Sequence, residues 1–166
     1  MAFIKSGATV LSFAEYQDIV DRDQRLFEAN EGLTIDIVED QLIRSTERIL
    51  TEFRASDWWK DYYGSQGGSV SRVDIPALDS NKIIARKSDF TDLCVYKALA
   101  EYILPKVADF GNEESAERQK MQYYTARSSA LFTELVIAGD WYDFDGDETI
   151  QTSEKMRGVS NLRRTR

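Results

Sequence analysis

Histidine is absent from this 166-residue chain, and Cys94 is its single cysteine. These two facts exclude an intramolecular disulfide, a Cys/His zinc site, a histidine-based catalytic triad and an imidazole general base. Without a histidine neighbour to lower its pKa, Cys94 is better explained as a small core residue than as a nucleophile. We therefore expect no enzymatic activity.

Proline is scarce, with 2 residues, while 30% of the residues are charged, and this combination favours helices over turn-rich β structure. No stretch approaches the roughly eighteen consecutive apolar residues of a membrane-spanning helix. We expect neither a signal peptide nor a membrane span, and a chain made in the cytoplasm. The predicted fold class is all-α: a bundle of about four helices with a central loop or small hairpin and an extended C-terminal arm.

Charge is unevenly distributed along the chain. Five basic residues against one acidic residue give residues 151–166 a net charge of +4, which leaves −12 on the first 150. An acidic body argues against a large phosphate-binding surface, so a DNA-binding accessory protein is a weak alternative. We divide the chain into a helical body (1–139), an acidic turn (140–154) and a basic arm (155–166), which has too few apolar residues to form a core alone.

Apolar residues recur at helical spacing in several segments. We expect a first helix over 13–29 with a capping box at Ser12 and Glu15, and a second over 34–53 with an Arg48–Glu52 ion pair. A third should begin at Ser88 and be stopped or kinked by Pro105. The last predicted helix opens at Asn112 and closes at Gly139, and short strands at 70–75 and 82–85 would form the hairpin.

Aromatic residues gather after Ser56, a candidate helix cap. Stacking of nucleic-acid bases is one interpretation, but the neighbouring Asp57 and Asp61 would repel phosphates. Packing, in the core or against another subunit, is the favoured interpretation, and we expect the cluster to supply aromatic anchors for a partner. These candidate partner-binding residues are Trp58, Trp59, Tyr62 and Tyr63. The only basic patch within the body, formed by Lys82, Arg86 and Lys87, is expected to be a solvated face or a partner contact.

The acidic turn has the spacing of a calcium-binding loop. Asp143, Asp145 and Asp147 occupy positions one, three and five of an EF-hand loop, and Glu154 occupies position twelve. Glu148 stands where the loop needs a glycine, and a positive φ there costs about 1 kcal/mol. Without a second such loop, the alternatives are a weak metal site that braces the turn and a solvated acidic hinge between body and arm. A two-carboxylate hydrolase would need a pocket that this stretch does not suggest.

A resemblance rests on the order of three segments: the amphipathic helix at 38–49, the helix at 92–102, and the closing helix that runs into Gly139-Asp-Trp-Tyr-Asp-Phe-Asp-Gly-Asp147. In this layout the chain resembles the head-tail connector (adaptor) proteins of tailed bacteriophages, from roughly Ser12 to the C-terminus.

The resemblance implies a structural protein without cofactor or catalysis. It would form a homo-oligomeric ring, a dodecamer in the usual case, between the portal protein and the next neck or tail protein. Genomic DNA would pass through the channel without specific binding, and the chain would reside in the neck of the virion after assembly in the host cytoplasm. A calcium-binding helical module is the alternative function. The arm would dock on a sister subunit or on the portal through Arg157, Arg163, Arg164 and Arg166.

Overall fold

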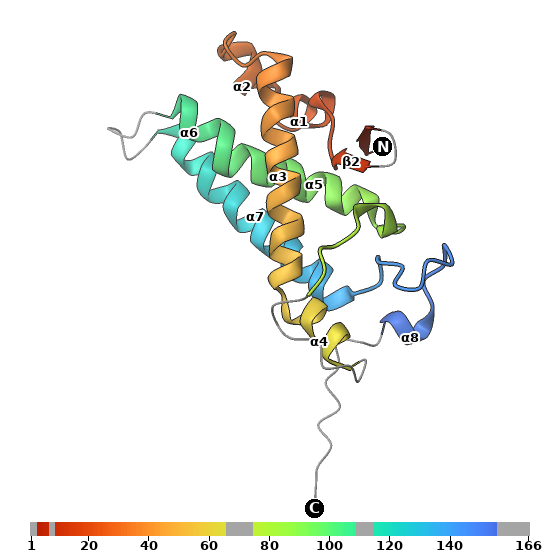
Figure 1. Ribbon diagram of the computed structural model, residues 1–166. Helices are drawn as coiled ribbons and strands as arrows, with labels where there is room; N and C mark the ends of the chain where they lie inside the picture. Colours follow the sequence, from red (N-terminus) through yellow and green to blue (C-terminus); the bar gives the residue numbers. More distant parts are fainter. Residues whose placement is uncertain (1–2, 7–8, 66–74, 109–114, 156–166) are drawn as a thin grey trace, which may run out of the picture.

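The structure is a computed structural model that describes residues 3–6, 9–65, 75–108 and 115–155. Its elements form a mostly helical body with one small sheet (Figure 1). In chain order they are β1 (Ile4–Ser6), β2 (Thr9–Ser12), α1 (Tyr16–Arg22), α2 (Gln24–Ala29), α3 (Ile35–Ala55), α4 (Asp57–Ser65), the 3-10 turn η1 (Ser80–Lys82), α5 (Lys87–Ala98), the π-helical segment η2 (Leu99–Ile103), α6 (Leu104–Val107), α7 (Ala116–Ala138) and α8 (Thr152–Lys155).

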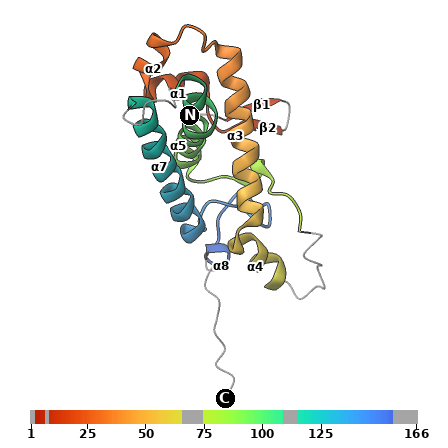
Figure 2. The ribbon, with the colours of Figure 1, turned by 90° about the vertical axis from the view of Figure 1, so that its left-hand side faces the viewer.

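Helix α5 lies at the centre of the body, packed against both α3 and α7 (Figure 2). From Phe90 to Ala98 all its side chains but that of Asp92 are buried, which is the pattern of a helix enclosed by its neighbours. Cys94 is fully buried within it, and burial raises the pKa of its thiol to about 11. The thiol is thus held in its neutral form, as expected of a core cysteine.

The second predicted helix is confirmed as α3. Its apolar side, including Val38, Leu42 and Ile49, is fully buried, but Ile35 at its first turn is exposed. The predicted ion pair between Arg48 and Glu52 is also present, at 3.0 Å. Glu52 in turn accepts a hydrogen bond from Lys97 of α5.

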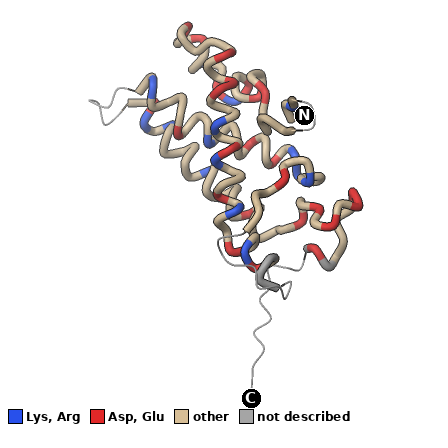
Figure 3. The backbone as a smooth tube through the Cα atoms, viewed as in Figure 1, with Lys and Arg blue, Asp and Glu red and all other residues tan. Residues whose placement is uncertain are grey.

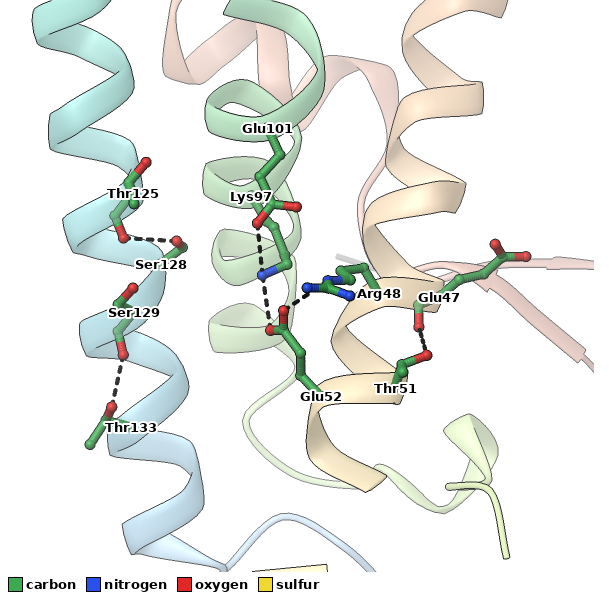
Figure 4. A network of polar contacts seen from close by, with 10 residues as sticks. All are labelled: Glu47, Arg48, Thr51, Glu52, Lys97, Glu101, Thr125, Ser128, Ser129 and Thr133. Atoms are coloured by element: carbon green, nitrogen blue, oxygen red, sulfur yellow. Dashed lines mark hydrogen bonds and ion pairs between the residues drawn. The ribbon is translucent and has the colours of Figure 1, made fainter. Parts of the chain in front are cut away.

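Lys97 of the central helix α5 forms an ion pair with α3 (Figure 4). Its Nζ lies 2.9 Å from Glu52 of α3 and 3.1 Å from Glu101 in η2, and its side chain is only 9% exposed. A buried ammonium group is tolerated because two carboxylates compensate its charge.

Pro105 does not stop the third helix, which continues through η2 into α6. Proline cannot donate a backbone hydrogen bond, and the widened π-helical turn that precedes it is a common accommodation at such a position. At the other end the helix starts at Lys87, one residue before the predicted cap Ser88.

The prediction of one helix over 13–29 is wrong. The chain forms the antiparallel hairpin β1–β2, which the sequence reading missed, and then α1 and α2 separated at Asp23. The break is stabilised from outside the segment, because Asp23 is buried and its carboxylate accepts hydrogen bonds from Lys120 (2.8 Å) and Tyr124 (3.4 Å) of α7. The capping box is formed by Glu15 with Asp18 and does not involve Ser12.

The last helix matches its prediction at the C-terminal end. Gly139 adopts φ 55° and donates its N–H to the Leu135 carbonyl at 3.0 Å, as a left-handed helix cap does. The described part of the helix is capped at its start by Ser115, whose hydroxyl accepts the Arg118 N–H. The predicted start at Asn112 lies outside the described residues.

The small hairpin predicted after α4 is not formed where the chain is described. Ile83, in its second predicted strand, makes an isolated antiparallel bridge with Tyr142. Of the rest of that strand, Lys82 is the last residue of η1 and residues 84–85 are loop, and residues 70–74 of its partner lie outside the described residues. The acidic segment after α7 thus occupies the pairing position expected for the hairpin.

Trp141 joins the segment after α7 to the core of the body. Its ring is fully buried, with centroids 4.9 Å from Phe53, 4.6 Å from Trp58 and 4.8 Å from Phe90. Its indole N–H donates to the Leu135 carbonyl at 2.7 Å. The interpretation of residues 140–154 as a hinge is therefore wrong for its first residues, which belong to the same core as the helices.

Replacement of Trp141 by alanine should destabilise the whole chain by about 3–5 kcal/mol, because it empties the space where α3, α4, α5 and the end of α7 meet. The measurement is urea unfolding followed by circular dichroism at 222 nm. Ile35→Ala is the control, since Ile35 is 53% exposed and its truncation should cost less than about 0.5 kcal/mol. A loss of the same small size for Trp141→Ala would contradict this placement.

Candidate metal centre

Three of the four predicted metal ligands come together after α7. Asp143, Asp145 and Asp147 each offer a carboxylate oxygen, and these atoms all lie within 4.8 Å of one another. Asp143 is buried, whereas the other two are exposed. Figure 3 shows acidic residues gathered along this segment. The cluster offers hard oxygen atoms, the ligand type that calcium and magnesium prefer.

The aspartates also fix the shape of the loop. Asp143 accepts hydrogen bonds from the backbone N–H groups of Gly146 (2.6 Å) and Glu148 (2.9 Å). Asp147 accepts them from the N–H of Thr149 and the side-chain amide of Gln151, both at 2.9 Å. Backbone N–H groups of the loop thus donate hydrogen bonds to the carboxylates of Asp143 and Asp147.

The protonation equilibria of the aspartates follow from these contacts. Burial raises the pKa of Asp143, but the N–H donors of Gly146 and Glu148 outweigh it and hold the pKa below its ordinary value. Hydrogen bonds from Thr149 and Gln151 lower the pKa of Asp147. Desolvation and the adjacent charge of Asp147 raise the pKa of Asp145. Mutual repulsion in such a cluster would be relieved by a bound cation.

Glu148 adopts the backbone conformation that the calcium-loop spacing predicts for position six. Its φ is 63°, in the left-handed region that glycine occupies without cost. Gly146, two residues earlier, has φ 85°. The chain therefore forms this turn with a non-glycine residue, although the side chain disfavours a positive φ.

Glu154, the fourth predicted ligand, forms hydrogen bonds to both sides of the loop. It is only 2% exposed, and its two carboxylate oxygens accept the N–H groups of Phe144 (2.9 Å) and Gln151 (2.8 Å). It sits in the short helix α8 and closes the loop by bonding both of its sides. Coordination of a metal by Glu154 would require it to exchange these hydrogen bonds for the ion.

The predicted basic patch stabilises the acidic segment. Lys82 donates to the Phe144 carbonyl at 3.0 Å, and its own carbonyl accepts the Asp143 N–H at 2.9 Å. Arg86 pairs with Asp140 at the end of α7 and with Asp89 in α5. For Lys82 and Arg86, the expectation of a solvated face or partner contact is therefore replaced by an intramolecular role.

The predicted aromatic anchors that the structure describes differ in how far they are buried. Trp58 and Trp59 are 4% and 1% exposed, so the core interpretation is correct for them and their assignment to a partner surface is wrong. Tyr62 is half-buried, with its ring centroid 4.0 Å from that of Phe144. The side chain of Tyr63 lies outside the description, as do the arm residues Arg157, Arg163, Arg164 and Arg166.

Comparison with protein-family models, with curated proteins and with solved structures gave no match to this chain. Among the described residues, no helix combines the length and the apolar character needed to cross a membrane.

Two substitutions in the loop should shift stability in opposite directions. Glu154→Ala leaves the buried Phe144 N–H without its acceptor and should lower the free energy of unfolding by about 1–3 kcal/mol. Glu148→Gly removes a side chain from a left-handed position and should raise it by about 0.5–1 kcal/mol. Urea unfolding of both variants beside the parent chain gives the comparison. Loss of stability on Glu148→Gly would contradict the assigned strain.

Proposed function

We propose that this chain is a structural head-tail connector of a tailed bacteriophage. It would form a homo-oligomeric ring, a dodecamer, between the portal and a tail or neck protein in the neck of the virion. The proposal rests on the layout of the sequence, in which α3, α5 and α7 carry the segments that resemble the connector family. As a connector it would act by shape and contact, without cofactor or catalysis.

The observation that best supports this function is where the basic arm begins. Residues 141–144 are anchored in the core, and α8 lies near α4, at the end of the body opposite α2 (Figures 1 and 2). The arm begins at Lys155, the last residue of α8, so it starts from one end of the helical body. A segment with net positive charge and few apolar residues that starts there is suited to bind a molecule beyond that end, such as the portal or a sister subunit.

The charge of the body and the acidic turn together suits a channel through which DNA passes. The first 150 residues carry a net charge of −12. Such a wall would have weak affinity for phosphates, so DNA could slide without being held. The proposed contact with DNA is therefore one of passage, with neither base recognition nor a phosphate-binding site.

Assembly on a portal tests the proposal. The full chain and a variant lacking residues 155–166 would each be mixed with purified portal rings of candidate host phages, and the mass of the complexes measured by native mass spectrometry. The full chain should add as a ring, whereas the truncated chain should stay folded by circular dichroism and bind at least about tenfold more weakly. A full chain that never joins a portal would exclude the connector function. An unfolded truncated chain would show that the arm belongs to the core.

Calcium binding is the second candidate function, favoured by the carboxylate cluster of Asp143, Asp145 and Asp147. Two features weaken such a site. Glu148 occupies a strained position, and Glu154 is already engaged by backbone N–H groups. The site would therefore bind calcium weakly, as a brace for the turn, with a dissociation constant of about 10⁻⁴–10⁻³ M.

Calorimetric titration with calcium chloride tests this second function. The parent chain should release or absorb heat with a dissociation constant of about 10⁻⁴–10⁻³ M, and Asp145→Asn should weaken binding at least about tenfold. Glu47→Gln, the same change of carboxylate to amide on an exposed residue of α3, is the matched control and should bind as the parent does. No heat from the parent at millimolar calcium would exclude a metal site here.

A further inference from the structure

Helix α7 has a second face that no described part of the chain covers. Its buried side, which includes Tyr124, Ser128 and Leu135, packs against α5, η2 and α6. On the other side Tyr123 is 57% and Ile137 79% exposed, the two most exposed large apolar side chains of the described residues. The helix runs along an outer edge of the body (Figures 1 and 2). This face is therefore open to a partner.

The exposed face repeats with the spacing of a coiled-coil seam. Its residues alternate by four and three positions, as the a and d positions of a heptad do, and all of them are exposed. They are Gln119, Tyr123, Ala126, Ala130, Thr133 and Ile137. Because the buried side already supplies the contact with the body, this second seam is not needed for the fold of a single chain.

The centre of the seam permits close approach of another helix. Ala126 and Ala130 have the smallest side chains on this face. The Thr133 hydroxyl donates to the Ser129 carbonyl of its own helix at 2.9 Å, so its hydrogen bond would survive burial (Figure 4). Tyr123 and Ile137 flank this flat centre with larger apolar groups. The face thus combines a close central contact with apolar burial at both ends.

The charges beside the seam specify the partner. Arg127 and Glu134 follow the d positions Ala126 and Thr133, both are exposed, and neither forms an ion pair within the part of the chain that the structure describes. The Arg127 guanidinium lies 6.0 Å from the ring centroid of Tyr96 in α5, a contact that leaves its charge without a carboxylate partner. Along the sequence, Arg127 and Glu134 are equally distant from the midpoint between Ala130 and Leu131. A second copy of the same helix, turned by a twofold rotation about that midpoint, would therefore bring Arg127 of each copy to Glu134 of the other.

We propose that a second copy of this chain binds this face, with the two α7 helices antiparallel. In the same arrangement Tyr123 of each copy lies beside Ile137 of the other. The two residues are offset along the helix axis by about one residue, roughly 1.5 Å. A parallel pair lacks this complementarity. In it, Arg127 and Glu134 of each copy would lie beside the other edge of the seam in the second copy, and that edge is uncharged: Gln122, Ser129 and Val136. The charge pattern thus selects both the partner and its direction.

The pair is distinct from the contacts of a connector ring. A twofold pair uses the same surface on both copies, whereas a cyclic ring joins two different surfaces of neighbouring copies. The α7 pair therefore does not by itself build such a ring, and it does not depend on the proposed function.

Sedimentation equilibrium of the full chain, from micromolar to millimolar concentration, tests the pair. The parent should show a reversible equilibrium between monomer and dimer. Arg127→Glu and Glu134→Arg should each weaken dimerisation at least about tenfold, because each places like charges together twice in the pair. The double variant Arg127→Glu/Glu134→Arg should restore the parent constant to within about threefold, since it exchanges the two charges without removing either ion pair.

Arg44→Glu on the exposed side of α3 is the matched control and should leave the dimer unchanged. Circular dichroism at 222 nm checks that each variant is folded. The proposal is overturned by a parent that stays monomeric at millimolar concentration, by a dimer that neither single reversal weakens, or by a double variant that stays as weak as the single ones. A chain that dimerises in this way but ignores portals would contradict only the connector function.

Discussion

The burial of Trp141 is the contact on which the arrangement of this chain depends. Its ring lies among aromatic side chains from α3, α4 and α5, while its indole N–H and its carbonyl bind backbone groups of α7 and of the loop before α5. One residue thereby fixes the end of the last long helix and the start of the acidic loop. Large aromatic residues contribute much of the energy of a core because each removes a large apolar area from water.

The acidic loop has its shape because of that anchor. Once Trp141 is in the core, Tyr142 pairs with Ile83 and Asp143 reaches backbone donors within the loop, while Glu154 closes the loop from α8. Polar groups that would otherwise be buried without partners are satisfied within this segment. The loop is therefore a fixed part of the body from which the basic arm begins.

The spacing of apolar residues predicted the long helices, because apolar residues at helical spacing form the side of a helix that is buried. The buried face of α3, the closure of α7 at Gly139 and the positive φ of Glu148 all follow from local sequence. The break at Asp23 could not be predicted, because it depends on partners in α7 that are distant in sequence. The same reason applies to the hydrogen bonds of Glu154, whose oxygens accept backbone N–H groups across the folded loop.

The sequence also identified the aromatic cluster but not its place. Trp58 and Trp59 could pack in the core or against another subunit, and their contacts with residues 141–144, which are distant in sequence, place them in the core. In the β1–β2 hairpin the alternation of apolar and polar residues is too short to be distinguished from the sequence of a loop. Such errors concern contacts between segments, which local patterns do not encode.

Amide hydrogen exchange measured residue by residue tests most directly whether the acidic loop belongs to the core. The N–H of Ile84 donates to the Trp141 carbonyl at 3.1 Å, and that of Asp143 to the Lys82 carbonyl at 2.9 Å. Both should exchange nearly as slowly as amides in the middle of α5, since they should open only with the body. If both exchange as fast as an amide without a hydrogen bond, the loop opens independently and its anchoring by Trp141 is refuted.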